Sequence, residues 1–394
     1  MNRTHTTRTL VVISFSLMLI AASATFLLSF FLFHHMERGG DSLQAELARI
    51  HEVRSIIAER FVGEYQESDL TEAALFATVH ALGDRWSHYL TQEQVEAQLR
   101  RSGNRHQGIG ISFHRHEDTN EMLVVGVTPG SPAEAAGLLP GETIVVLEGH
   151  FTRDLTTEEI QQLVTDQFEN YVTLTVRSEY RRMRTIEIEV KEFYVTPILY
   201  ELKGENIGFI RIINFDETSA MGTVEAIHAL KEMGAEGLVF DVRANPGGRL
   251  QEFLSIMDYL LPEGEIFVYE DQHGIEHVRH SGPNYLKMPM VVIVDAGSFS
   301  AAELFAAVLQ EYDWAQVVGV PTSGKNRVQV IIPLSTGSGL HLSVSRYLTP
   351  GRVDLYESGG VQPDYVVENE IGGEDLQMEK ALEVIERLIR ENSP

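Results

Sequence analysis

The sequence has 394 residues, enough for two or three domains with buried cores, and its 43% hydrophobic and 22% charged residues are ordinary for a globular protein. Its formal net charge of −26 argues against nucleic-acid binding, because contact with phosphates needs a basic surface. The absence of cysteine excludes disulfide bonds, thiol catalysis and thiolate metal sites.

The first predicted element is a membrane anchor at about residues 10–33. This segment of 24 residues carries no charge and is long enough to cross a bilayer. Arg3 and Arg8 precede it, so residues 1–40 are expected to form a cytoplasmic tip and a single-pass anchor in a bacterial cell membrane, with the remainder of the chain extracytoplasmic. A cleaved signal peptide is the alternative, since Ala22-Ser23-Ala24 resembles a cleavage site. We favour the anchor because the apolar run continues to Phe33.

Residues 41–101 are predicted to form a helical lobe. Apolar residues recur at helical spacing from Leu43 to Ile57 and again from Leu70 to Leu82. We interpret this lobe as a packing or dimerising region, which makes the chain a candidate homodimer.

Residues 102–192 read as a small domain of short strands. Apolar and polar residues alternate in four segments, and one helix is expected over 158–164. The predicted strands cover residues 122–127, 143–147, 172–176 and 186–190. The run Gly108, Ile109, Gly110 and Ile111 resembles the carboxylate-binding loop of PDZ domains, where backbone N–H groups bind the C-terminus of a peptide. Turns at 128–138 and 140–142 are similar to those of the same domain family.

Residues 193–372 alternate between strand and helix patterns, which predicts an α/β (α+β) core. Strands are expected at 207–211, 237–242 and 290–295, and helices at 218–232, 250–260 and 301–312. The final segment, 373–394, is predicted to be an amphipathic packing helix.

Three residues in this core suggest hydrolytic chemistry. Ser300 lies where a buried strand turns into a helix, beside N–H groups that favour negative charge. Lys325 follows a loop glycine, and it is one of only six lysines. A buried lysine can lose its charge and accept the proton of a serine in place of histidine. Gln329 lies four residues further on, in an apparent strand. Alternatively, the serine caps the helix and the other two are ordinary polar positions.

In these segments the chain resembles the carboxyl-terminal processing proteases, also called tail-specific proteases, of the S41 serine peptidase family. The resemblance extends over nearly everything after the first forty residues, and the order of its motifs is its most specific feature. Those motifs are Gly83 to Leu90, the PDZ-like stretch from Gly108, Gly237 to Gly248, Asp295 to Ser300, Thr322 to Gln329, and Arg346 to Pro350.

The resemblance implies a crotonase-like protease core with an inserted PDZ domain. It implies Ser300 as nucleophile, Lys325 as general base and Gln329 as the residue that orients the lysine amine. The oxyanion would be bound by the backbone N–H of Ala301 and of either Gly247 or Gly248. Protein or peptide substrates with unstructured C-terminal tails are expected, and no metal or cofactor.

Two departures from the family pattern leave other functions open. Phe299 stands where the family has a small residue, and Asn326 stands where it has glycine. Phe299 makes a catalytically silent PDZ scaffold conceivable, and the crotonase-like core makes an acyl-CoA enzyme a second alternative, against which the anchor and the acidic composition speak. A Ser-His-Asp hydrolase and a zinc protease are disfavoured, since neither Gly-x-Ser-x-Gly nor His-Glu-x-x-His occurs.

Overall fold

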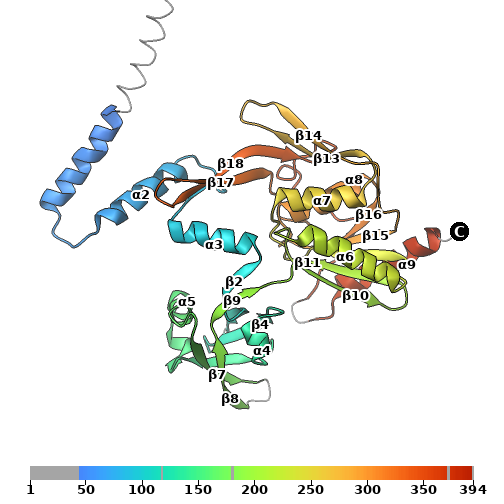
Figure 1. Ribbon diagram of the computed structural model, residues 1–394, viewed down its shortest axis with the longest axis horizontal. Helices are drawn as coiled ribbons and strands as arrows, with labels where there is room; N and C mark the ends of the chain where they lie inside the picture. The colour runs from blue at the N-terminus through green and yellow to red at the C-terminus, as the bar shows by residue number, and fades with distance from the viewer. Residues whose placement is uncertain (1–43, 117–118, 179–181, 371–372, 393–394) are drawn as a thin grey trace, which may run out of the picture. The chain divides into compact units, whose positions relative to one another are not determined.

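The computed structural model describes residues 44–116, 119–178, 182–370 and 373–392 (Figure 1). The predicted anchor at about residues 10–33 lies outside these residues. Among the helices that the structure describes, none is long and apolar enough to span a bilayer. The chain divides into two units, one ending at Ala73 and the other beginning at Ala74.

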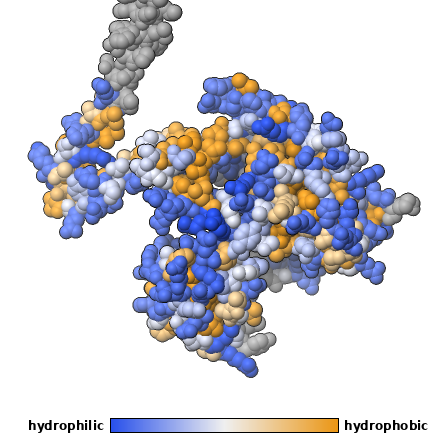
Figure 2. Space-filling view, in the orientation of Figure 1, coloured by the Kyte–Doolittle hydropathy of each residue, from blue (hydrophilic) through white to orange (hydrophobic). Residues whose placement is uncertain are grey.

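The described part of the first unit, from residue 44 on, contains mainly helix, as its periodicity predicts. Residues 44–60 form one helix, and α2 (Glu67–His80) begins in this unit and ends in the next. Apolar side chains remain about half exposed along the first helix, at Leu47, Ile50, Val53 and Ile56. Figure 2 shows such apolar residues at the surface of this unit. Within the described residues, this helix therefore has an apolar face that is not buried.

The centre of the second unit is a six-stranded sheet in the order β10-β11-β12-β15-β16-β19. Its strands from β11 to β19 are parallel, and β10 pairs antiparallel with β11 at the edge. The strands are β10 (Ile198–Lys203), β11 (Ile207–Ile212), β12 (Gly237–Asp241), β15 (Met290–Val294), β16 (Ala315–Gly319) and β19 (Tyr365–Val366). The parallel pairing agrees with the strand-helix alternation in the sequence.

Helices cover both faces of this sheet, so its strands are apolar on both sides. Ile210, Phe240 and Val292 pack with α6 (Ser219–Glu232), α7 (Leu250–Leu260) and α8 (Ala301–Glu311) in the larger core. The opposite face packs against α9 (Leu376–Asn392), the C-terminal amphipathic helix. These helices lie within three residues of their predicted positions.

A second, antiparallel sheet has the order β1-β18-β13-β14, with β17 also paired to β18. Its strands are β1 (His88–Leu90), β13 (Gly264–Glu270), β14 (Glu276–Ser281), β17 (Arg327–Pro333) and β18 (Gly339–Leu348). Strand β1 interrupts the region that we expected to be helical up to residue 101; only α3 (Gln92–Ser102) continues that pattern. The motif around Asp84 therefore contributes to this sheet rather than to a separate lobe.

The PDZ-like region forms its own sheet of β3 (Ile111–Arg115), β4 (Met122–Val127), β5 (Thr143–Leu147), β7 (Tyr171–Arg177) and β8 (Met183–Glu189), with β6 (His150–Phe151) beside β5. The helices α4 (Pro132–Ala135) and α5 (Thr157–Thr165) complete it. Its core is separate from that of the central sheet. A two-stranded ribbon of β2 (Arg105–Gly108) and β9 (Lys191–Tyr194) carries the chain into and out of this region.

Candidate active site

Ser300 lies at the sharp turn between β15 and α8, as the sequence predicts. Its backbone has φ of 58° and ψ of −113°, a conformation that is costly for any residue except glycine. Strained strand-to-helix turns of this kind expose nucleophilic serines in other hydrolases. The strain therefore supports a role for Ser300 beyond capping the helix.

Hydrogen bonds beneath the turn hold this conformation. The Ser298 hydroxyl donates to the Val242 carbonyl at 2.8 Å, and the Phe299 N–H donates to the Asn245 carbonyl at 2.9 Å. Ser298 is completely buried, so it cannot be the nucleophile that substrate reaches. Hydrogen bonds thus join the segment that follows β12 to the segment that follows β15, immediately before Ser300.

Lys325 lies in the loop before β17, and its amine faces two aromatic rings. Its Nζ atom is 4.8 Å from the centre of the Phe299 ring and 5.6 Å from that of Trp86. Burial lowers the pKa of Lys325 to about 8, although the carboxylates of Glu303 and Asp84 oppose the shift. The amine is therefore far easier to deprotonate than that of an ordinary lysine.

This low pKa predicts the pH dependence of any reaction in which Lys325 acts as base. The amine must be neutral to accept a proton, and it is protonated below its pKa of about 8. We therefore expect kcat/KM on a disordered protein to increase with pH and to level off above about pH 8. Initial rates between about pH 6 and about pH 10 measure this. A profile that is flat across this range would rule out a lysine base.

Glu303, on the first turn of α8, ties the serine turn to the lysine loop. Its carboxylate is completely buried and accepts four hydrogen bonds. The donors are the N–H groups of Ser300 at 2.9 Å, Gly324 at 2.6 Å and Lys325 at 3.0 Å, and the hydroxyl of Thr322 at 2.6 Å. Because both segments bind one carboxylate, their positions relative to each other are fixed.

Gln329 is the third residue of β17 and pairs with Ser343 of β18. The pairing of the two strands is irregular between Val328 and Gln329. Its Nε2 atom donates to the Ser343 hydroxyl at 3.1 Å. Among the residues that the structure describes, no hydrogen bond joins Gln329 to Lys325, or Lys325 to Ser300. Such contacts are often loose without substrate.

The two glycines of the Asn245-Pro246-Gly247-Gly248 turn differ in their hydrogen bonding. The Gly247 N–H donates to the Asn245 side chain at 2.8 Å. Within the described part of the chain, the N–H groups of Gly248 and Ala301 have no partner. A Cβ atom on Gly247 would come within 2.8 Å of the Cβ atom of Ser300 and 3.0 Å of the Ala301 nitrogen. The turn therefore lies directly against the serine, and Gly248 is the glycine with a free donor.

One cleft of about 580 Å³ brings these residues together. All six predicted catalytic and oxyanion residues line it: Gly247, Gly248, Ser300, Ala301, Lys325 and Gln329. Tyr347 lines it as well. Burial raises the pKa of Tyr347 far above its ordinary value, Glu303 adds to this effect and Ser300 opposes it, so the phenol stays protonated beside the serine.

The predicted carboxylate-binding loop lies in the PDZ region, and none of its residues 108–111 lines this cleft, although His106 of β2 does. The carbonyls of Ile109 and Gly110 accept hydrogen bonds from Ala133 and Thr128, both at 2.9 Å. The N–H groups of the same two residues have no partner among the described residues. Gly110 has φ of 80°, and a Cβ atom there would come within 2.2 Å of Ser131, so only glycine fits. Unpaired N–H groups on a fixed loop suit an anionic ligand.

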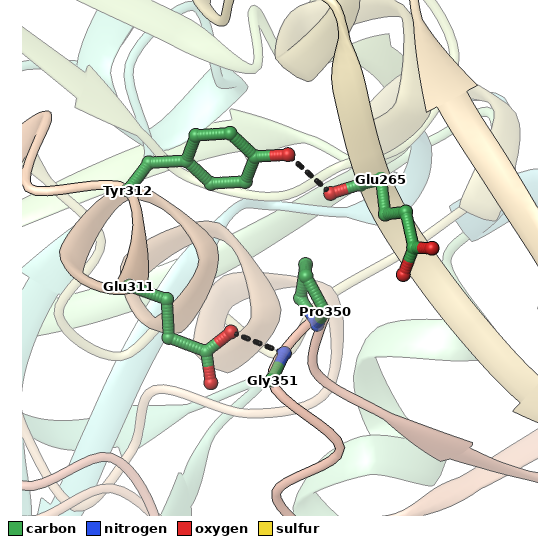
Figure 3. Close-up of a pocket in the computed structure, with 5 residues that line it drawn as sticks. All are labelled: Glu265, Glu311, Tyr312, Pro350 and Gly351. Carbon is green, nitrogen blue, oxygen red and sulfur yellow. Dashed lines mark hydrogen bonds between the residues drawn. The ribbon is translucent and has the colours of Figure 1, made fainter.

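A second cavity, of about 430 Å³, contains no comparable chemistry (Figure 3). In it the Tyr312 hydroxyl donates to the Glu265 carbonyl, and Glu311 accepts from the Gly351 N–H, each at 2.9 Å. Glu311 also binds the hydroxyl of Thr349. These contacts attach the end of β18 to α8, which holds Tyr347 beside Ser300.

Sequence reasoning missed Glu303, although a signal for it was present. Ser300-x-x-Glu303 is the spacing of a capping box, in which the glutamate binds the N–H of the first residue. Trp86 was noted only as part of a motif, and its contact with Phe299, at 5.2 Å between ring centres, needed the structure. That contact places the motif from Gly83 to Leu90 next to the lysine.

Comparison with known families gives two matches. Residues 206–367 match the model of peptidase family S41, and residues 97–177 match the PDZ domain. The PDZ match begins and ends earlier than the predicted domain, 102–192. The ribbon of β2 and β9 supports the later end, because residues 191–194 pair with residues 105–108.

Similar proteins have related names. The carboxyl-terminal-processing protease of Synechocystis sp. is 30% identical over 291 residues, which cover 71% of this chain and 68% of that protein. The carboxyl-terminal-processing protease of Picosynechococcus sp. is 30% identical over 316 residues, 77% of this chain and 76% of that protein. The solved structure of the photosystem II D1 C-terminal processing protease has a TM-score of 0.53 at 24% identity and covers 85% of this chain and 90% of that chain, which shows a shared fold.

Proposed function

Because this chain belongs to peptidase family S41 and is a carboxyl-terminal processing serine protease with a PDZ domain, we propose that Ser300 and Lys325 perform its peptide cleavage. The observation that carries this proposal is the cleft where a strained serine and a lysine with a pKa of about 8 lie together. Mass spectrometry of the proteins that accumulate when Ser300→Ala replaces the wild type would identify the substrates.

The reaction follows from the roles of these side chains. Neutral Lys325 takes the proton of Ser300 as the serine oxygen bonds to the peptide carbonyl carbon. The resulting ammonium gives its proton to the amine that leaves when the C–N bond breaks. Water then attacks the acyl group on Ser300, with Lys325 again as base, and releases the new C-terminus.

The negative oxygen formed during attack needs two fixed donors. We assign these to the N–H groups of Ala301 and Gly248, because both are unpaired among the described residues. The Gly247 N–H is used by Asn245. Gly247 would instead provide the close backbone approach, since any side chain there would collide with Ser300.

The PDZ domain is proposed to bind the C-terminal carboxylate of the substrate through residues 108–111. Its unpaired N–H groups at Ile109 and Gly110 support this role. We expect amidation of the C-terminus of a model tail peptide to weaken binding by about tenfold or more, since a charge-assisted hydrogen bond is lost. Fluorescence anisotropy on the Ser300→Ala protein measures this without cleavage. Equal affinities for the free and amidated peptides would reject carboxylate capture.

A membrane location is proposed from the sequence alone. If residues 10–33 anchor the chain, its substrates are tails of secreted or membrane proteins. The full chain should then resist extraction by carbonate, and residues 41–394 should be digested by protease added to spheroplasts. A soluble form that begins near residue 25 would show that the segment is a cleaved signal peptide and not an anchor. Protection of the catalytic part from protease would show that the topology is the reverse of the one proposed.

A homodimer remains an expectation for the helical lobe. The apolar side chains exposed at Leu47, Ile50, Val53 and Ile56 support it, because a helix with an unburied apolar face is suited to packing against another surface.

A further inference from the structure

A chain of polar groups leads from the Asp84–Ser87 turn to Gln329. The Ser87 hydroxyl donates to the Asp84 carboxylate at 2.6 Å and accepts the N–H of Ser343 at 3.0 Å. The Ser343 hydroxyl in turn accepts the Nε2 hydrogen of Gln329 at 3.1 Å. Ser343 is the residue directly paired with Gln329 across strands β17 and β18. Three separate parts of the chain thus meet beside the lysine.

The Asp84 carboxylate fixes the direction of these hydrogen bonds. Burial raises the pKa of Asp84, but hydrogen bonds from Ser343, from Ser87 and from the Trp86 N–H together lower it below its ordinary value, so the group is a carboxylate. A carboxylate only accepts hydrogen bonds, and the Ser343 hydroxyl already accepts from Gln329, so its one hydrogen is free to point toward the Asp84 carboxylate, whose pKa it helps to lower. The Ser343 oxygen can then only accept a hydrogen from Gln329.

The orientation of the Gln329 amide follows from this. Its NH₂ group must face Ser343, which leaves Oε1 on the other side; within the described residues that oxygen has no hydrogen-bond partner. Gln329 and Lys325 line the same cleft. The free oxygen can accept an N–H of the lysine amine and leave the nitrogen lone pair for the proton of Ser300. The opposite amide orientation would present an N–H to that lone pair and block it.

We propose that Asp84, Ser87 and Ser343 are positioning residues that fix the Gln329 amide with its oxygen available to Lys325. This inference rests on the proposed function, in which Lys325 is the base and Gln329 orients it. It assigns a role to the Gly83-Asp84-Arg85-Trp86-Ser87 segment, which lies far from the catalytic residues in the sequence but is joined to them by β1 and β18.

The test compares single and double variants. Ser343→Ala should lower kcat by about tenfold or more with KM changed less than about twofold, because proton transfer and not substrate binding is affected. Ser343→Thr keeps the hydroxyl and should restore most of kcat. Ser345→Ala, two residues along the same strand, is the matched control and should retain wild-type kcat. In a Gln329→Ala background, Ser343→Ala should have no further effect, since the two act through one amide.

Asp84→Asn is the second variant, because it keeps the shape of the side chain but can present NH₂ to Ser343. Because the Asp84 charge also raises the pKa of Lys325, kcat is compared above about pH 9, where the lysine is neutral in both proteins. There Asp84→Asn should lower kcat and be without further effect in the Gln329→Ala background. Thermal unfolding checks that each variant is folded. Full activity of folded Ser343→Ala, or an equal loss with and without Gln329, would overturn the inference. Retained activity in Ser300→Ala or Lys325→Ala would instead overturn the proposed function on which it rests.

Discussion

Replacing Ser300 or Lys325 by alanine is expected to reduce kcat/KM for a disordered protein substrate by about 10⁴-fold or more, because the nucleophile and its base act as one unit. For the same reason the double variant should lose little more than either single variant. Ser300 is at the strained turn and Lys325 is in the same cleft, as the roles of nucleophile and base require. Timed digestion followed by mass spectrometry of the fragments measures the loss.

Matched controls separate chemistry from folding in this experiment. Ser255→Ala removes an exposed serine of α7 that binds only its own helix, and Lys287→Ala removes an exposed lysine. Both should cleave at the wild-type rate. The two active-site variants should unfold at temperatures close to that of the wild type. Cleavage by folded Ser300→Ala at the wild-type rate would refute the assignment.

Glu303→Ala is expected to destabilise the protein by about 3 to 5 kcal/mol, because four donors, two of them fully buried, lose their buried acceptor together. Activity should fall as well, since the serine turn and the lysine loop would no longer share an anchor. Urea denaturation and cleavage assays measure the two effects. Gln310→Ala, on the same helix, removes one exposed hydrogen bond to Gln362 and is the control for the helix itself.

Glu303→Gln provides the more specific test of this anchor. Each carboxylate oxygen accepts two hydrogen bonds: one binds Thr322 and Gly324, and the other binds Ser300 and Lys325. A glutamine must turn its NH₂ group toward at least one backbone N–H in either orientation. We therefore expect it to be nearly as damaging as alanine. A Glu303→Gln protein with wild-type stability and activity would show that the carboxylate is not the anchor.

The sequence was most informative where local patterns decide the structure. The sequence predicted the strand from Met290 to Val294, the turn with Ser300 and the helix that follows. A short apolar run before a turn of mostly small residues is compatible with few structures other than a buried strand. The parallel order of the central sheet agreed with the alternation of strands and helices. PDZ strands β4 and β5 begin and end at the predicted residues.

The antiparallel sheet was largely missed, because it is built from distant segments. Strand β1 has three residues and pairs with β18 some 250 positions later, which no local pattern indicates. The environment of Lys325 depends on this pairing, since Trp86 and Asp84 reach the lysine only when β1 is in place. The choice between Gly247 and Gly248 also needed the hydrogen bond from Gly247 to Asn245.

Covalent labelling with a fluorophosphonate, followed by peptide mapping, tests the central claim most directly. The reagent forms a stable bond to a serine oxygen whose proton is removed by a nearby base. We expect a single label on the peptide that carries Ser300, formed faster at about pH 9 than at about pH 7 and greatly slowed in Lys325→Ala. A label on another serine, or labelling of Ser300 that is equally fast without Lys325, would contradict the assignment of this pair as nucleophile and base.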